Sequence, residues 1–190
     1  SFENCDVTTD AGAEKALQIA RDNPGALLLS SLPCTAGCPW WHINEKLPRG
    51  RQRRRQHLQQ LRRMLAAWLP VAREVTASDG CIGWEWPRNC SLWRDQQVIA
   101  IIEEFGLTPA LFDGCAYGLR SESGSNAGLP ILKPWTLATN CPALYKRFHG
   151  KRCPGKHVHA THAPCAGQDT SRSAFYPRRM AVEFHKGWLD

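Results

Sequence analysis

Cys34 and Glu85 are the two residues of this 190-residue chain whose types and positions best suit catalysis. Cys34 follows the mostly apolar segment 26–32, and Glu85 comes near the end of the apolar segment 81–86, both of which indicate buried strands. Ligands of open α/β sheets bind beyond the carboxyl ends of the strands. A cysteine there supplies a nucleophile and a glutamate exchanges protons. The alternatives are a small buried cysteine and a carboxylate paired with an arginine.

The segment 153–165 is rich in potential zinc ligands, with five Cys or His residues in thirteen positions. Structural zinc takes four such ligands in a tetrahedral arrangement. The predicted ligands are Cys153, His157, Cys165 and one of His159 and His162, with His159 as the first choice. The alternative is a basic loop whose histidines contact phosphates or solvent. Zinc is therefore an expected cofactor.

The net charge of +7 is concentrated in two basic regions. The first consists of arginines in a predicted helix, Arg51, Arg53, Arg54 and Arg55, and the second adjoins the Cys/His segment with Lys151, Arg152 and Lys156. Two basic regions on an otherwise acidic chain predict a polyanionic partner, most simply nucleic acid, with DNA as the expected form. The alternative is a solvated helix face.

Composition narrows the class of protein. The hydrophobic share of 43% and charged share of 22% are typical of a soluble domain and exclude a fibre or a disordered tail. The longest unbroken apolar run, 64–69, is far shorter than the roughly 20 residues that a membrane span needs. Nine cysteines without a secretion signal indicate reduced thiols and an intracellular protein, nuclear if it acts on DNA.

The predicted elements place the two catalytic candidates at one edge of a sheet. Helices over about 11–21, 51–78 and 93–104 alternate with the two buried strands, which predicts a parallel α/β sheet. Segments 111–119 and 130–138 indicate a terminal antiparallel hairpin. The expected fold is a mostly parallel, Rossmann-like sheet over residues 1–140, followed by a basic, Cys/His-rich extension over residues 141–190.

These residues also carry a family resemblance. Leu-Leu-Ser-Ser-Leu-Pro-Cys at 28–34 resembles the strand and Pro-Cys motif of cytosine-C5 DNA methyltransferases, and Glu85 resembles the glutamate of their Glu-Asn-Val motif. The terminal hairpin resembles the reversed last strand pair of class I S-adenosylmethionine-dependent methyltransferases. Segments 32–35, 85–87, 112–119 and 133–135 are similar to methyltransferase-like domains in retroelement-type polyproteins of marine eukaryotes.

The resemblance implies methyl transfer from S-adenosylmethionine to a cytosine through a covalent adduct. Cys34 would attack C6 of the ring, and Glu85 would protonate N3. The cofactor-binding residues that it implies are Asp6, at the end of an earlier strand, and Ser31, Leu32 and Pro33. The implied geometry is testable, because Cys34 and Glu85 must then lie side by side.

The chain departs from the family pattern in four ways. The family's glycine-rich Phe-x-Gly-x-Gly cofactor loop would fall upstream of residue 1, and Thr35 replaces a glutamine. Glu85 is followed by Trp-Pro, and no Gln-Arg-x-Arg motif precedes the end of the terminal hairpin. Other functions therefore stay open. One is a non-catalytic, zinc-stabilised nucleic-acid-binding module of a mobile-element polyprotein. Others are a methyltransferase acting on amino groups and a cysteine hydrolase that pairs Cys34 with His42. Trp40 and Trp41 would stack on a base or pack over the strand ends.

Overall fold

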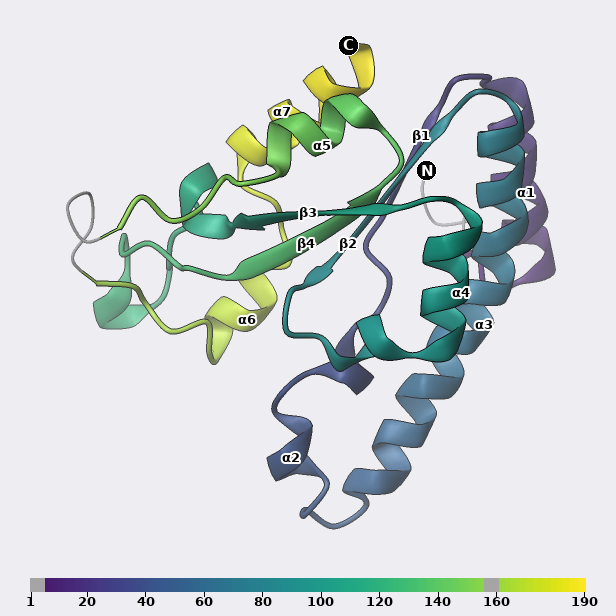
Figure 1. Cartoon of the computed structure of the whole chain (residues 1–190). Helices are drawn as coiled ribbons and strands as arrows, with labels where there is room; N and C mark the ends of the chain where they lie inside the picture. The colour runs from purple at the N-terminus through teal and green to yellow at the C-terminus, as the bar shows by residue number, and fades with distance from the viewer. Residues whose placement is uncertain (1–5, 156–160) are drawn as a thin grey trace.

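A four-stranded sheet runs through the centre of the protein, with helices on both faces (Figure 1). The computed structural model describes residues 6–155 and 161–190. The strand order is β1-β2-β4-β3, and the strands are β1 (Leu27–Ser30), β2 (Cys81–Pro87), β3 (Thr108–Asp113) and β4 (Pro134–Thr139). The α/β class predicted from the sequence is confirmed.

The prediction of a mostly parallel sheet is wrong. β1 and β2 are parallel, with Leu27 opposite Cys81, but β4 is antiparallel to both of its neighbours, β2 and β3. The expected antiparallel pair does exist, and its returning strand is inserted beside β2, where Leu137 lies opposite Glu85. An apolar strand pattern reports burial on both faces and does not specify which strand is the neighbour.

The hairpin also has different bounds from those predicted. β3 ends at Asp113, and the chain turns into the short helix η4 (Gly114–Tyr117) instead of continuing as a strand to residue 119. The turn is anchored because the N–H of Gly114 donates to the carbonyls of Leu132 and Lys133, at 2.8 and 3.0 Å. Packing of η4 therefore lengthens the connection to β4.

One face of the sheet is covered by α1 (Asp10–Asp22), α3 (Gly50–Ala77) and α4 (Gln96–Glu104) (Figure 1). Helical spacing on α3 places Leu61 and Leu65 on its buried side, where they belong to one core with Trp84 and Trp86 of β2. Trp68 joins this core, and its indole N–H donates to Ser30 Oγ at 2.7 Å. Alternation along β2 directs Glu85, which lies between the two tryptophans, to the other face.

The second face is covered by α5 (Pro142–Phe148) and α7 (Arg178–Leu189). Its core combines Phe112 and Trp135 of the sheet with Leu144, Phe148 and Met180 of these helices. This core therefore contains residues from both sides of the domain boundary predicted at residue 140. The short α6 (Gln168–Arg172) precedes the loop that leads to α7.

Short helical turns fill the remaining connections: η2 (Thr35–Gly37), α2 (Trp41–Asn44), η3 (Ser91–Arg94) and η5 (Gly124–Asn126). In the part of the chain that the structure describes, no helix combines the length and the apolar character that crossing a membrane would require.

Candidate active site and metal-binding cluster

A cavity of about 700 Å³ lies beyond the carboxyl ends of β1 and β2. Both catalytic candidates line it: Cys34 on the segment after β1 and Glu85 on β2. The opposite walls come from the segment leading into β4 and from the region between residues 163 and 176. Cys34 and Glu85, which the cytosine-methyltransferase resemblance places side by side, therefore both line one cavity.

Glu85 is a buried carboxyl group, with 4% of its surface exposed. Its Oε2 accepts hydrogen bonds from Tyr176 Oη at 2.8 Å and Ser31 Oγ at 3.2 Å, whereas Oε1 has no hydrogen-bond partner among the described residues. Burial raises the pKa of Glu85, against the opposing effects of Tyr176, Lys133, Ser31 and the Trp135 indole. A carboxyl group with a raised pKa can stay neutral and donate a hydrogen bond.

Cys34 is a half-buried thiol that caps η2. Its pKa is raised, first by burial and then by the negative charge of Glu85, and the ammonium group of Lys133 lowers it only slightly. The thiol is therefore the resting form rather than the thiolate. Because Glu85 contributes to this shift, a ligand that keeps Glu85 neutral would make Cys34 easier to ionise.

Lys133 places a cation in the same cavity. Its Nζ donates to the carbonyl and the hydroxyl oxygens of Ser173, at 2.6 and 3.1 Å, and lies 4.9 Å from the ring centroid of Trp135. The backbone of Lys133 has a φ of +26°, a strained value for a residue with a side chain. Burial lowers the pKa of Lys133, and the charges of Cys165, Glu85 and Cys34 oppose that effect.

Sequence reasoning did not single out Lys133, Tyr176 or Ser173 as site residues. Lys133 had one usable signal, because it belongs to segment 133–135, one of those similar to methyltransferase-like domains. Tyr176 had none, since 91 positions separate it from Glu85 and only the packing of the α6–α7 connection brings them together.

The two adjacent tryptophans have different environments. Trp40 lines the cavity and is 61% exposed, so the stacking role predicted for it is sterically open. Trp41 is buried, and its indole N–H donates to the carbonyl of Thr35, in keeping with the packing interpretation. The side chain of His42, the base of the hydrolase hypothesis, lies outside the described part of the structure.

Of the residues predicted to bind S-adenosylmethionine, one lines this cavity. Ser31 lines the cavity, but Leu32 is buried and its carbonyl accepts a hydrogen bond from the Trp86 indole, and neither it nor Pro33 lines the cavity. Asp6 lies in an exposed turn before α1, where its carboxylate accepts from the N–H and hydroxyl of Thr8 at 2.9 and 2.7 Å. Residues 6–9 form a turn, and the residues before Asp6, where the expected strand would run, lie outside the described part of the chain.

Three side chains form a group that could hold a metal ion: Cys115, Cys153 and His162. Their donor atoms lie within 4.8 Å of one another, and Cys153 Sγ is 3.4 Å from His162 Nε2. Two thiols and an imidazole are donors that zinc binds. The three come from η4, from the chain after α5 and from the segment that precedes α6.

The structure brings together only part of the ligand set predicted from the sequence. Cys153 and His162, the predicted alternative to His159, belong to the group, but Cys165 instead lines the large cavity, with its Sγ 3.2 Å from Ser173 Oγ. The predicted ligands His157 and His159 lie outside the described residues. Cys115 takes part because the turn at the end of β3 brings it to Cys153 across 38 positions, which spacing within the Cys/His segment cannot reveal.

The predicted nucleic-acid-binding residues fall into two classes. Arg51, Arg53 and Arg55 are exposed on the first turns of α3, in the part of that helix that extends past the sheet (Figure 1). Arg54 is half-buried, pairs with Glu45 and donates to the Ala36 carbonyl at 3.1 Å, so it connects elements of the fold.

The second basic region follows α5. Lys151 and Arg152 are exposed, and Arg152 Nη1 lies 3.7 Å from the carboxylate of Asp113. Asp113 also accepts from the N–H of Cys153 at 2.9 Å, so this basic region adjoins the metal-binding group. Lys156 lies outside the described residues.

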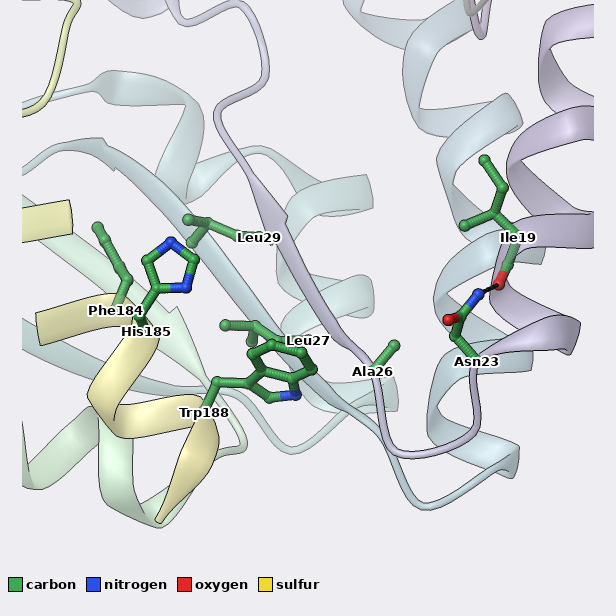
Figure 2. Close-up of a pocket in the computed structure, with 8 residues that line it drawn as sticks. All are labelled: Ile19, Asn23, Ala26, Leu27, Leu29, Phe184, His185 and Trp188. Carbon is green, nitrogen blue, oxygen red and sulfur yellow. Dashed lines mark hydrogen bonds between the residues drawn. The ribbon is translucent and has the colours of Figure 1, made fainter. Parts of the chain in front are cut away.

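A second cavity, of about 380 Å³, lies between α1, β1 and α7 (Figure 2). Ile19 of α1 and Asn23, directly after that helix, line it on one side, and Phe184, His185 and Trp188 of α7 line it on the other. Its wall is mainly apolar, and Asn23 donates a hydrogen bond to the carbonyl of Ile19 at 2.8 Å. Neither Cys34 nor Glu85 reaches it, so it is not part of the candidate active site.

Comparison with known proteins finds no matching family model, no matching curated protein and no matching solved structure.

Proposed function

We propose that this chain is a methyltransferase-like domain that acts on nucleic acid, with DNA as the substrate, and that its cavity binds a cytosine base. The observation that carries the proposal is the cavity lined by both the Cys34 thiol and the buried Glu85 carboxyl group. A flipped-out base is read through its Watson–Crick edge and by stacking. A cavity of about 700 Å³ leaves room for a base, and Trp40 offers an aromatic surface at its wall.

The hydrogen bonds of Glu85 favour a neutral carboxyl group that can donate a proton to the base. Oε2 already accepts from Tyr176 and Ser31, so a proton on the neutral carboxyl group belongs on Oε1. That proton can be donated to N3 of cytosine. Glu85 would then bind the base and withdraw electrons from its ring during nucleophilic attack.

The proposed covalent step is addition of Cys34 to the cytosine ring. The sulfur forms a bond to C6, the C5=C6 electron pair shifts toward C4, and the C4=N3 pair takes the proton from Glu85. The proton lost by the thiol restores that of Glu85, so the net change is addition of S–H across C6 and N3. The C5 atom becomes nucleophilic in this adduct, and S-adenosylmethionine, when bound, would supply the methyl group that it accepts.

Covalent trapping tests this step without a methyl donor. The probe is a DNA oligonucleotide that carries pyrimidin-2-one in place of cytosine, because loss of the electron-donating amino group makes C6 more electrophilic. We expect a denaturation-resistant protein–DNA adduct whose cross-linked peptide contains Cys34. The adduct should be absent in Cys34→Ala and formed at least tenfold more slowly in Glu85→Gln.

Cys38→Ala is the matched control, since Cys38 lines the same cavity four positions away. It should form the adduct at the wild-type rate. An adduct that persists in Cys34→Ala, or that maps to Cys38 or Cys165, contradicts the assigned nucleophile.

A second candidate function is a non-catalytic nucleic-acid-binding module stabilised by zinc. The observations that favour it are the exposed arginines of α3 and the Cys115–Cys153–His162 group. This function predicts tight binding of unmodified DNA and one zinc ion per chain, without any adduct at Cys34. Action on DNA in either role would place the protein in the nucleus.

A further inference from the structure

We infer that zinc, as a thiophilic divalent cation, binds Cys115, Cys153 and His162. The bound ion would hold two walls of the cavity that contains Cys34 and Glu85 in place. This inference deepens the proposed function, because it names how the geometry of that same cavity is controlled.

The spacing of the three donors fits a zinc ion. With Zn–S near 2.3 Å and Zn–N near 2.0–2.1 Å, tetrahedral angles require a sulfur–nitrogen separation of about 3.5 Å and a sulfur–sulfur separation of about 3.8 Å. Cys153 Sγ lies 3.4 Å from His162 Nε2, and all three donor atoms are within 4.8 Å of one another. The ligands therefore converge with little rearrangement.

Hydrogen bonds to the backbone and the carboxylate of Asp113 hold the chain around Cys153 in place. The N–H of Cys153 donates to Asp113 Oδ2 at 2.9 Å, and the N–H of Asp113 donates to the carbonyl of Lys151 at 2.9 Å. Asp113 also accepts from Arg88 at 2.8 Å. This network fixes the chain after α5 to the end of β3, directly before Cys115, so two of the ligands share one support.

Two connections join the metal-binding group to the cavity. Gly114, adjacent to Cys115, donates to the carbonyls of Leu132 and Lys133, which both line the cavity. On the other side, His162 directly precedes Ala163, whose N–H donates to the Pro130 carbonyl at 2.9 Å.

The chain from Ala163 to Cys165 forms part of the cavity wall. A cation that joins Cys115 to His162 therefore connects the wall that contains Lys133 with the wall that contains Cys165. Metal loss would loosen the second wall, because the Ala163–Pro130 hydrogen bond would then hold it without the neighbouring ligand.

The test measures metal content and thiol reactivity in the wild-type chain of 190 residues. We expect one zinc ion per chain after purification, and a cobalt(II)-substituted form with thiolate-to-metal charge-transfer absorption. Removing the zinc with a chelator should increase the rate of alkylation of Cys165 at least tenfold. Peptide mass spectrometry measures this rate. Cys81, at the opposite end of β2 from the cavity, reports global unfolding and should keep its rate.

A substitution tests the ligand assignment independently. Cys115→Ser should lower the zinc affinity at least tenfold and give the fast alkylation of Cys165 even with zinc present, whereas Cys81→Ser should do neither. If Cys115→Ser fails to fold, the chelator experiment on the wild-type chain still decides the question.

Three results would overturn the inference: no zinc at stoichiometric level, wild-type zinc affinity in folded Cys115→Ser, or an unchanged Cys165 rate after zinc removal. The formation of the covalent adduct at Cys34 is measured independently of zinc content and of Cys165 alkylation. A zinc-dependent cavity wall without any adduct therefore rejects the proposed function alone, and an adduct without zinc dependence rejects this inference alone.

Discussion

The hydroxyl of Tyr176 donates a 2.8 Å hydrogen bond to Oε2 of Glu85. This bond joins the α6–α7 connection to β2 in the candidate active site. This bond opposes the effect of burial on the pKa of Glu85 more than any other contact does. It also determines which carboxyl oxygen is left to carry a proton toward a ligand. The chain between α6 and α7 therefore contributes directly to the candidate active site.

Removing the Tyr176 hydroxyl should destabilise the protein. Tyr176→Phe leaves Glu85 with one fewer donor, and the loss of a buried hydrogen bond to a carboxyl group costs about 1–2 kcal/mol in the free energy of unfolding. Chemical denaturation at pH 7 measures this change. Tyr145→Phe on α5 is the control and should cost less than about 0.5 kcal/mol; equal losses in the two variants would show that the bond to Glu85 is unimportant.

The raised pKa of Glu85 predicts a pH-dependent stability. Because the folded chain binds this proton more tightly than the unfolded chain, the free energy of unfolding falls as pH rises from about 4.5, the ordinary value, through the raised folded value. Above the folded value the loss is complete. Glu85→Gln removes this titration, so its stability relative to wild type should increase between pH 4 and pH 8, as measured by denaturation at each pH.

The exposed Glu14→Gln on α1 is the matched control for this measurement. A stability difference between Glu85→Gln and wild type that stays constant across this pH range would contradict the raised pKa.

The reactivity of Cys34 should depend on Glu85. The carboxylate charge raises the pKa of the Cys34 thiol, so Glu85→Gln should lower that pKa and increase the thiolate fraction at pH 8. The pH dependence of iodoacetamide alkylation, followed at the Cys34 peptide, should shift to lower pH in the variant. Cys90, whose pKa burial raises to about 12, should remain slow in both proteins, and an unchanged pH dependence at Cys34 would show that the Glu85 charge does not act on that thiol.

Nucleic-acid binding should depend on the exposed arginines of α3. Replacing Arg51, Arg53 and Arg55 with alanine should weaken duplex binding about 10- to 100-fold near 0.1 M salt and reduce the slope of log K against log salt by about 2–3. Fluorescence anisotropy at several salt concentrations measures both. A charge-matched triple variant of the exposed Lys15, Arg178 and Arg179 is the control, and equal losses would indicate a general charge effect without a defined interface.

Local pattern was sufficient for much of the framework. The helical spacing of Leu61 and Leu65 predicts the long α3, and the apolar runs around Leu28 and Trp84 predict β1 and β2 close to their observed bounds. The same runs place Cys34 and Glu85 near strand ends. Because β1 and β2 are parallel neighbours, that local information was enough to bring the two residues to one cavity.

Position along the chain was misleading for the metal-binding group. Cys153 and Cys165 are close in sequence, but the backbone turns toward the cavity after His162, and Cys165 contacts Ser173 instead. Cys115 enters the group from a different element. The error has the same origin as the wrong sheet topology, since both depend on which distant segments pack together.

By itself, the amino-acid sequence determined the α/β class, the main helices, the two parallel strands and the chemical types at their ends, because periodicity and strand–turn signals are local. Only the tertiary structure decided that β4 lies between β2 and β3, that Tyr176 and Lys133 complete the cavity, and that Cys115 joins Cys153 and His162. Those arrangements depend on burying both faces of one sheet at once. The favourable free energy of that burial comes from residues far apart in the chain, so no local pattern specifies it.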